Sequence, residues 1–99
     1  MLNVKFGEDD VTALLALLDF LPVDDLATAV RSALETGKQA TITPGGRVRA
    51  VTFADTAHAQ FLLKSIDHFL KHGKPSGEQR RCLNRATALL YSAISELSR

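Results

Sequence analysis

Apolar and polar side chains alternate over the first residues of the chain, with Leu2, Val4 and Phe6 as the apolar positions. A period of two is typical of a strand that buries one face. Gly7 follows the last apolar residue directly. The pattern therefore predicts a strand over residues 2–6.

Two helices are predicted next. Three acids open residues 8–20, where negative charge favours the positive end of a helix. The apolar residues of this segment cover more than one stripe. A second helix is expected to begin near Pro22, a residue suited to the first helical position, and to end at Gly37. Its apolar residues recur on a single face: Leu26, Ala29, Val30, Ala33 and Leu34.

Residues 39–53 are predicted to form a hairpin around residues 44–46. A three-residue loop would place Ile42 opposite Val48, whereas a two-residue loop would place Ile42 opposite Arg47. We favour the three-residue loop because it keeps one face apolar and one face polar. The polar face would then hold Thr41, Thr43, Arg47 and Arg49. Phe53 would also lie on that face, which a bulge or an early exit from the strand would have to explain.

The remaining sequence predicts two more helices. Asp55 or Thr56 can cap the third, which should end at Gly73. Ser76 and Gln79 have the spacing of a capping box at the start of the fourth, which is expected to continue to about residue 98. The order β-α-α-β-β-α-α predicts a single domain over residues 1–99. Its fold class is α+β and mainly helical: a small three-stranded antiparallel sheet with four helices.

The short connection between the last two helices makes them neighbours, so we expect an antiparallel pair. One helix should contribute Leu83, Leu90, Ile94 and Leu97 to the contact, and the other should contribute Phe61, Leu62, Ile66 and Phe69. Apolar residues make up 45% of the chain, enough for a core without disulfide bonds. A lone cysteine, Cys82, and the lack of a signal-peptide pattern or a span-length apolar run favour a cytoplasmic protein with no membrane partner.

Charge divides the chain into two opposed parts. Residues 1–35 carry seven acids and two bases, whereas residues 36–99 carry ten bases and four acids. We expect these parts to meet each other, to meet a second copy, or to offer the basic part to an anionic partner. The candidate anion- or partner-binding residues are Arg47, Arg49, Lys71, Lys74, Arg80, Arg81 and Arg85.

Three interpretations of these bases stay open: a solvated surface, a site for an acidic protein, and a site for nucleic acid. The last is suggested by the order of elements, which matches the second half of a winged helix with the hairpin as its wing. The preceding helix argues against it, because its outer positions include Asp24, Asp25 and Glu35 and would be repelled by phosphates. If the arginines instead serve the fold or a dimer, their expected partners are the acids of the first part of the chain, notably these three, from the same or a second copy.

Other chemistry is sparse in the sequence. His68 and His72 have a spacing that can chelate a metal, but no third ligand is evident. Cys82 is either a thiol activated by neighbouring arginines or a small packing residue. The sequence lacks a phosphate-binding glycine loop, a metal triad and a nucleophile elbow, so we expect no catalytic residue, no metal and no cofactor.

The predicted function is a non-enzymatic protein-interaction or regulatory module that acts by binding, as a homodimer. The basis is the first helix, whose large apolar residues exceed what one face of a small core should bury. The predicted interface residues are Leu14, Leu17, Leu18, Phe20 and Leu21. A small DNA- or RNA-binding regulator, using the hairpin and the basic fourth helix, is the alternative.

Overall fold

A computed structural model describes residues 2–43 and 46–97 of the chain, and the side chains of residues 2–37 and 46–97. This part of the chain is mainly helical and has four helices. The elements follow the predicted order: β1 (Leu2–Gly7), α1 (Glu8–Phe20), α2 (Asp25–Thr36), β2 (Lys38–Thr43), β3 (Gly46–Phe53), α3 (Thr56–His72) and α4 (Gly77–Leu97).

The predicted small three-stranded antiparallel sheet needs correction at β2. Within the described residues, an unbroken antiparallel ladder joins only two strands, β1 and β3, from the pair Leu2–Phe53 to the pair Gly7–Val48. β2 lies on the other side of β3, and its pairing shifts in register between Gln39 and Thr41. In the two-stranded antiparallel ladder of β1 and β3, both strands contribute buried side chains to the core.

The predicted hairpin register is wrong as well. Thr43 pairs with Gly46 and Ile42 pairs with Arg47, so two residues connect the strands instead of three. Gly46 has a φ of 122°, a backbone conformation that glycine adopts without strain. The side chains of Thr41 and Thr43, which were expected on the polar face, lie outside the described residues.

Pairing with β1 decides which face of β3 is buried. Val4 lies opposite Val51 and Leu2 lies opposite Phe53, and these side chains are buried together in the core. Because side chains alternate along a strand, Arg49 lies on this inner face. The predicted orientation is therefore inverted, and Phe53 needs neither a bulge nor an early exit.

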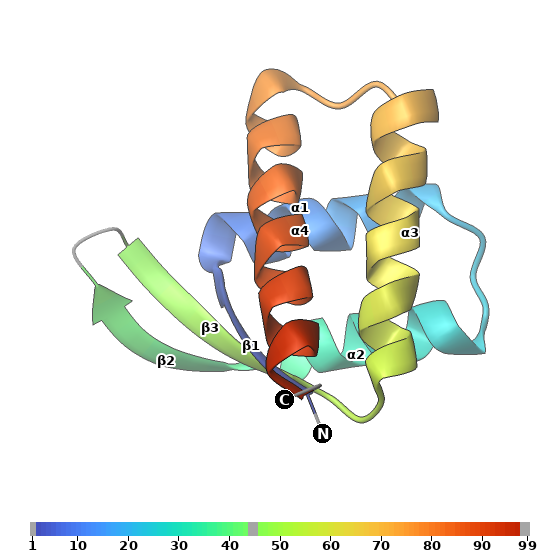
Figure 1. Cartoon of the computed structure of the whole chain (residues 1–99). Coiled ribbons are helices and arrows are strands. Elements are labelled where there is room, and N and C mark those ends of the chain that lie inside the picture. Colours follow the sequence, from blue (N-terminus) through green and yellow to red (C-terminus); the bar gives the residue numbers. More distant parts are fainter. Residues whose placement is uncertain (1, 44–45, 98–99) are drawn as a thin grey trace.

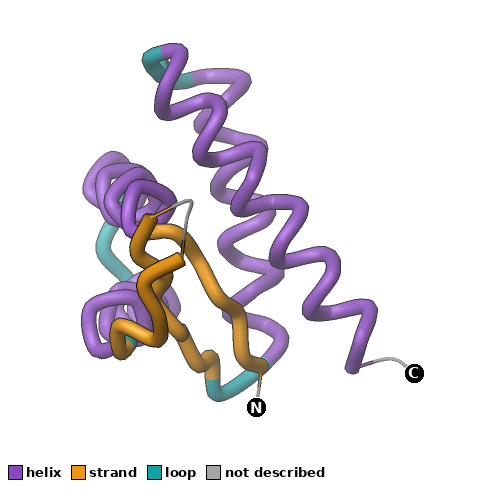
Figure 2. Tube along the Cα trace, turned by 90° about the vertical axis from the view of Figure 1, so that its left-hand side faces the viewer, coloured by secondary structure: helices purple, strands orange, loops and turns teal. Residues whose placement is uncertain are grey.

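The helices form two crossing pairs. α3 and α4 stand side by side, and α1 and α2 cross behind them (Figure 1). From the side, α3 and α4 form one layer, and α1, α2 and the strands form the other (Figure 2). The end of the β2–β3 hairpin projects away from the helices (Figure 1).

α1 lies at the centre of this arrangement. It contacts α2, α3, α4, β1 and β3. Helices on several sides bury Val11, Leu14, Leu17 and Leu18 together, and these side chains are at most 3% exposed. The crossing pairs therefore bury most of the circumference of α1 in a chain of 99 residues, and its exposed stripe is limited to Asp9, Thr12, Ala16, Asp19 and Phe20.

Capping groups fix most helix starts. Asp55 caps α3 by accepting from the Ala57 N–H at 3.0 Å, and this bond lowers the pKa of the Asp55 carboxyl. Ser76 and Gln79 form the predicted capping box of α4, with bonds of 2.9 and 3.1 Å. α2 begins at Asp25 instead of near Pro22, because the Asp24 side chain caps it by accepting from the Ala27 N–H at 2.7 Å.

The predicted α3–α4 pair forms, and α4 contributes Leu83 and Leu90 to the core as fully buried side chains. Ile94 is partly buried at its edge. Leu97 was expected in the core but is 53% exposed, because it lies in the last turn of α4.

Candidate functional site

Arg49, a predicted anion-binding residue, forms hydrogen bonds and an ion pair within the protein. Its Nε and NH2 groups donate to the two carboxylate oxygens of Glu8 at 3.0 and 2.9 Å. Its NH1 group donates to the Leu34 carbonyl oxygen at 3.1 Å. One guanidinium therefore connects β3, the first turn of α1 and the last turns of α2. Three of its five N–H donors have partners within the fold, and the Glu8 carboxylate neutralises its charge, which disfavours an external phosphate.

Replacing Arg49 with alanine is expected to lower the free energy of unfolding by about 2–3 kcal/mol, because a bidentate charged contact and a helix-end carbonyl lose their donors. A double-mutant cycle with Glu8→Gln, followed by urea denaturation, should show coupling between the two residues. Arg47→Ala is the control, since Arg47 is exposed and should change stability by less than about 0.5 kcal/mol. Equal losses for Arg49 and Arg47 would contradict this assignment.

Arg85 also pairs with an acid of the first part of the chain. Its Nε lies 3.7 Å from Oδ1 of Asp10, a residue that is fully buried in the first turn of α1. The other oxygen of Asp10 accepts from the Gly7 N–H at 3.3 Å, while Oδ1 has no hydrogen-bond partner. Asp10 is one of three consecutive acids, and no pattern in the sequence distinguishes it as the buried one.

The two parts of the chain thus neutralise each other through Glu8 and Asp10. Among the described residues, the expected partners Asp24, Asp25 and Glu35 form no ion pair with Arg49 or Arg85. Asp24 caps α2, and the Glu35 carboxylate lies 3.8 Å from Arg31 on the same helix. The predicted meeting of opposite charges therefore occurs, but with other acids.

Arg47 and Arg85 line one hollow at the start of α1, together with Glu8 and Asp9. Two guanidinium groups thus face two carboxylates across the same space. A lining of mixed sign does not select a phosphate. The structure brings these two candidate arginines together without creating a basic site.

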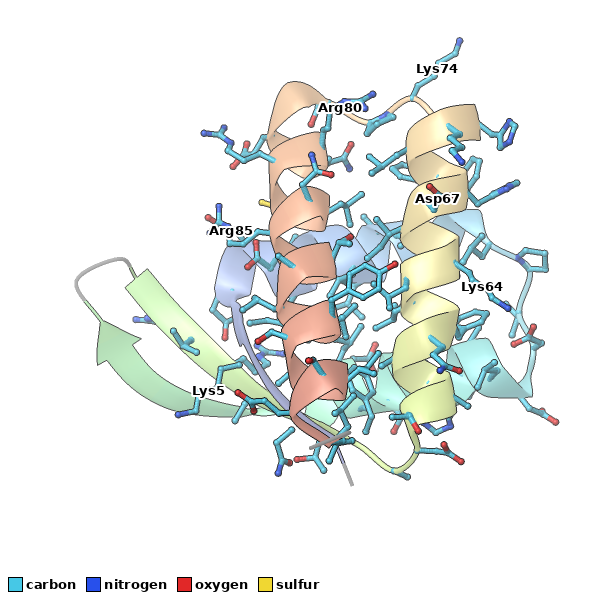
Figure 3. The ribbon with its side chains drawn as sticks, viewed as in Figure 1. Lys5, Lys64, Asp67, Lys74, Arg80 and Arg85 are labelled. Atoms are coloured by element: carbon cyan, nitrogen blue, oxygen red, sulfur yellow. The ribbon has the colours of Figure 1, made fainter. Side chains whose placement is uncertain are left out.

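The other four candidate bases form a separate group, which we call the basic end: Lys71, Lys74, Arg80 and Arg81. All are exposed, and all lie within about a turn of the connection between α3 and α4. Figure 3 shows Lys74 and Arg80 at this connection, away from Arg85. Lys71 forms an exposed i,i+4 ion pair with Asp67 at 3.1 Å.

The predicted interface on α1 needs correction. Leu14, Leu17 and Leu18 are at most 3% exposed and Leu21 is partly buried, so a partner cannot reach them as a face. Phe20 is 54% exposed and packs edge-on against Phe69, with ring centroids 5.2 Å apart. Of the predicted set, Phe20 has the most accessible side chain.

An apolar groove runs along the outer face of α3 and α4, which we call the α3–α4 groove. Its lining includes Leu63, Leu70 and Tyr91, and its volume is about 360 Å³. Tyr91 is 62% exposed. Lys64, Asp67 and Asn84 add polar groups to the lining. One feature of the sequence could have indicated this groove. Leu63 and Leu70 lie seven residues apart, next to the core-facing residues of α3, and so repeat on one side of the helix.

Cys82 is a packing residue in the structure. It is 4% exposed and lies beside Asp10. Burial raises the pKa of the Cys82 thiol, the Asp10 carboxylate raises it further, and Arg85 opposes these effects only in part. Because the thiolate is the nucleophile, the interpretation of Cys82 as an arginine-activated thiol is not supported.

His68 and His72 lie close together on the exposed side of α3, with ring centroids 4.7 Å apart. Within residues 2–43 and 46–97, no three His, Cys, Asp or Glu side chains are grouped so that they could hold a metal ion. No helix in this part of the chain is both long and apolar enough to cross a membrane. Comparison with protein families, curated proteins and solved structures finds no match to this chain.

Proposed function

We propose that this protein is a non-enzymatic interaction module that acts by binding, as a homodimer, and that the α3–α4 groove is its interface. The observation that carries the proposal is the exposed Tyr91 side chain beside an apolar groove. Tyrosine is enriched at protein interfaces because its ring gains from burial while its hydroxyl still finds a partner. The lone Cys82 supports a reducing compartment, and we place the protein in the cytoplasm.

The charges of the groove favour a second copy as the occupant. Lys64 and Asp67 both line the groove and lie one turn apart on α3, where Figure 3 shows them. In a two-fold symmetric contact, the same surface meets itself in the opposite direction. Lys64 of one copy then lies opposite Asp67 of the other. The present partner of Asp67 is Lys71, in an exposed pair of the kind that contributes little to stability.

The size of the surface is compatible with this contact. A standard interface buries about 800 Å² on each partner, and the described chain exposes 6108 Å² in total. One face of two antiparallel helices can provide such an area. Burial of Tyr91, Leu63 and Leu70 would supply the apolar centre, with the charged residues at the rim.

The test is the mass in solution. Light scattering at about 100 µM should report a dimer, because a dimer with an interface of standard size stays associated at that protein concentration. Tyr91→Lys should give a folded monomer with little change in melting temperature when both proteins are dilute. Phe20→Lys, which changes an exposed aromatic residue away from the groove, should remain dimeric.

Charge reversal tests the arrangement within the interface. Lys64→Asp or Asp67→Lys alone should weaken the dimer, because like charges then face each other. The double exchange should restore it, because the complementary pairs are re-formed. A monomeric wild-type protein, or a dimer that Tyr91→Lys leaves intact, would overturn the proposal.

The alternative, a small DNA- or RNA-binding regulator, has less support. Arg49 and Arg85 are paired with Glu8 and Asp10, so the hairpin and α4 offer fewer free charges to phosphates than the sequence suggested. Phosphate contacts provide most of the affinity in non-specific nucleic-acid binding. We therefore retain nucleic acid only as an outcome to be tested at the basic end.

A further inference from the structure

We infer that the basic end is a docking surface for an acidic segment of a partner protein. Residues 71–81 contain four bases and one acid, whereas the rest of the chain contains eight bases and ten acids. The positive charge of the whole chain therefore comes from this short segment. A concentrated charge of one sign attracts a partner of the opposite sign and orients its approach.

The basic end differs from the other charged parts of the structure because three bases without an ion pair lie together within residues 74–81. Lys5, Arg47 and Lys64 also form no ion pair among the described residues, but they lie on three separate elements, β1, β3 and α3. Arg31, Arg49 and Arg85 each form an ion pair with an acid. Among the described residues, Lys74, Arg80 and Arg81 form no ion pair; at the basic end only Lys71 has one, with Asp67. Three cations are therefore available without first breaking an internal contact.

The backbone that carries these cations is held in place. The Gly73 N–H donates to the Phe69 carbonyl at 2.7 Å, and a Cβ at Gly73 would lie 2.6 Å from the Phe69 ring. The Ser76–Gln79 capping box fixes the other side of the connection. A surface that is already ordered loses less conformational entropy on binding.

An acidic protein segment fits this surface better than a nucleic acid. Residues 71–81 include no Phe, Tyr or Trp, and the ring of His72 already lies against the ring of His68, with centroids 4.7 Å apart, so the basic end provides little platform for stacking bases. Glu78 is exposed among the bases. A protein segment can place an uncharged residue opposite Glu78, whereas every nucleotide of a nucleic acid carries a negative phosphate. Two neighbouring arginines suit carboxylates, which guanidinium groups bind in a bidentate geometry.

This inference is independent of the proposed homodimer. The α3–α4 groove is lined by residues of α3 up to Leu70 and residues of α4 from Asn84 onward, and none of the four bases lines it. Loss of the dimer would therefore leave the basic end intact. A variant of the basic end should likewise leave the mass in solution unchanged.

The test compares two labelled probes by fluorescence anisotropy at low salt: an octamer of glutamate and an oligothymidylate of matched charge. The wild-type protein should bind the peptide more tightly than the oligonucleotide, and the affinity should fall as salt is raised. Reversing both Arg80 and Arg81 to glutamate should weaken peptide binding about tenfold or more, as two exposed carboxylate contacts are lost. Lys74→Glu, in the connection itself, is a second variant with the same expected direction.

The matched control is the double variant Lys5→Glu, Arg47→Glu, which changes the net charge equally at exposed positions of the sheet. It should change peptide affinity by less than about twofold, because screening limits distant charges. Equal losses in both double variants would show that only net charge matters. Tighter binding of the oligonucleotide would instead assign the surface to nucleic acid. Either result, or no peptide binding by the wild-type protein, would overturn the inference.

Discussion

Replacing Leu17 with lysine is expected to unfold the protein. Leu17 is 1% exposed, at the centre of the core formed around α1. The change removes about 2 kcal/mol of apolar burial and adds an unpaired buried charge that costs several kcal/mol more. A domain of this size has a total stability of only about 5–15 kcal/mol. Circular dichroism of the purified variant should therefore show loss of the helical signal at room temperature.

Phe20→Lys is the informative comparison, because Leu17 and Phe20 were both predicted to belong to the same interface. Phe20 is half exposed, and its main contact is the edge of the Phe69 ring. We expect this variant to fold and to lose about 1 kcal/mol, the value of one aromatic contact. A folded Leu17→Lys protein would mean that α1 can leave the core, and the structure would then be wrong at its centre.

Replacing Leu90 with alanine is expected to have the next largest effect. Leu90 is fully buried where α4 meets the core, and its truncation leaves a cavity among close-packed neighbours. Such substitutions lower the free energy of unfolding by about 2–5 kcal/mol. Urea denaturation of the wild-type and variant proteins gives the difference directly from their midpoints and slopes.

Leu97→Ala is the matched control on the same helix. The Leu97 side chain is 53% exposed, so little burial is lost and the change in stability should stay within about 0.5 kcal/mol. A loss below 1 kcal/mol for Leu90→Ala would place Leu90 outside the core. Similar losses for the two variants would mean that the phase of α4 is misassigned.

The large apolar residues of α1 were predicted to form an interface because they were considered too many for one small core. Most of them are buried within the protein. The number of apolar residues on a helix reports how much of it is buried, but not what buries it. In this protein α2, α3, α4 and the strands surround α1, and the chain itself supplies the covering surface. Among the described residues, the exposed large apolar side chains are instead Phe20, Val23, Tyr91 and Leu97. Of these, Tyr91 lines the α3–α4 groove, and the core pattern of α4 made no prediction for it.

The charged residues show a similar limit. The sequence correctly indicated that acids of the first part would meet bases of the second. It could not identify Glu8 and Asp10 as those acids, because the contacts Arg49–Glu8 and Arg85–Asp10 depend on how β3 and α4 lie against the start of α1. Among the described residues, the bases nearest the α3–α4 connection stay at the surface, and three of them form no ion pair.

Local features of the sequence determined the number and order of the helices. The Ser76–Gln79 capping box, the Asp55 cap and the glycine after α3 act within a few residues of themselves, so their effects survive in any tertiary context. The register of the hairpin, the buried face of β3 and the surroundings of α1 were decided by tertiary structure. Each of these features depends on residues distant in sequence. β1 determines which face of β3 is buried, through the pair Val4–Val51. Three helices and two strands pack against α1. Alternation and periodicity specify that a face is buried, but the element that packs against it is set only when the whole core closes.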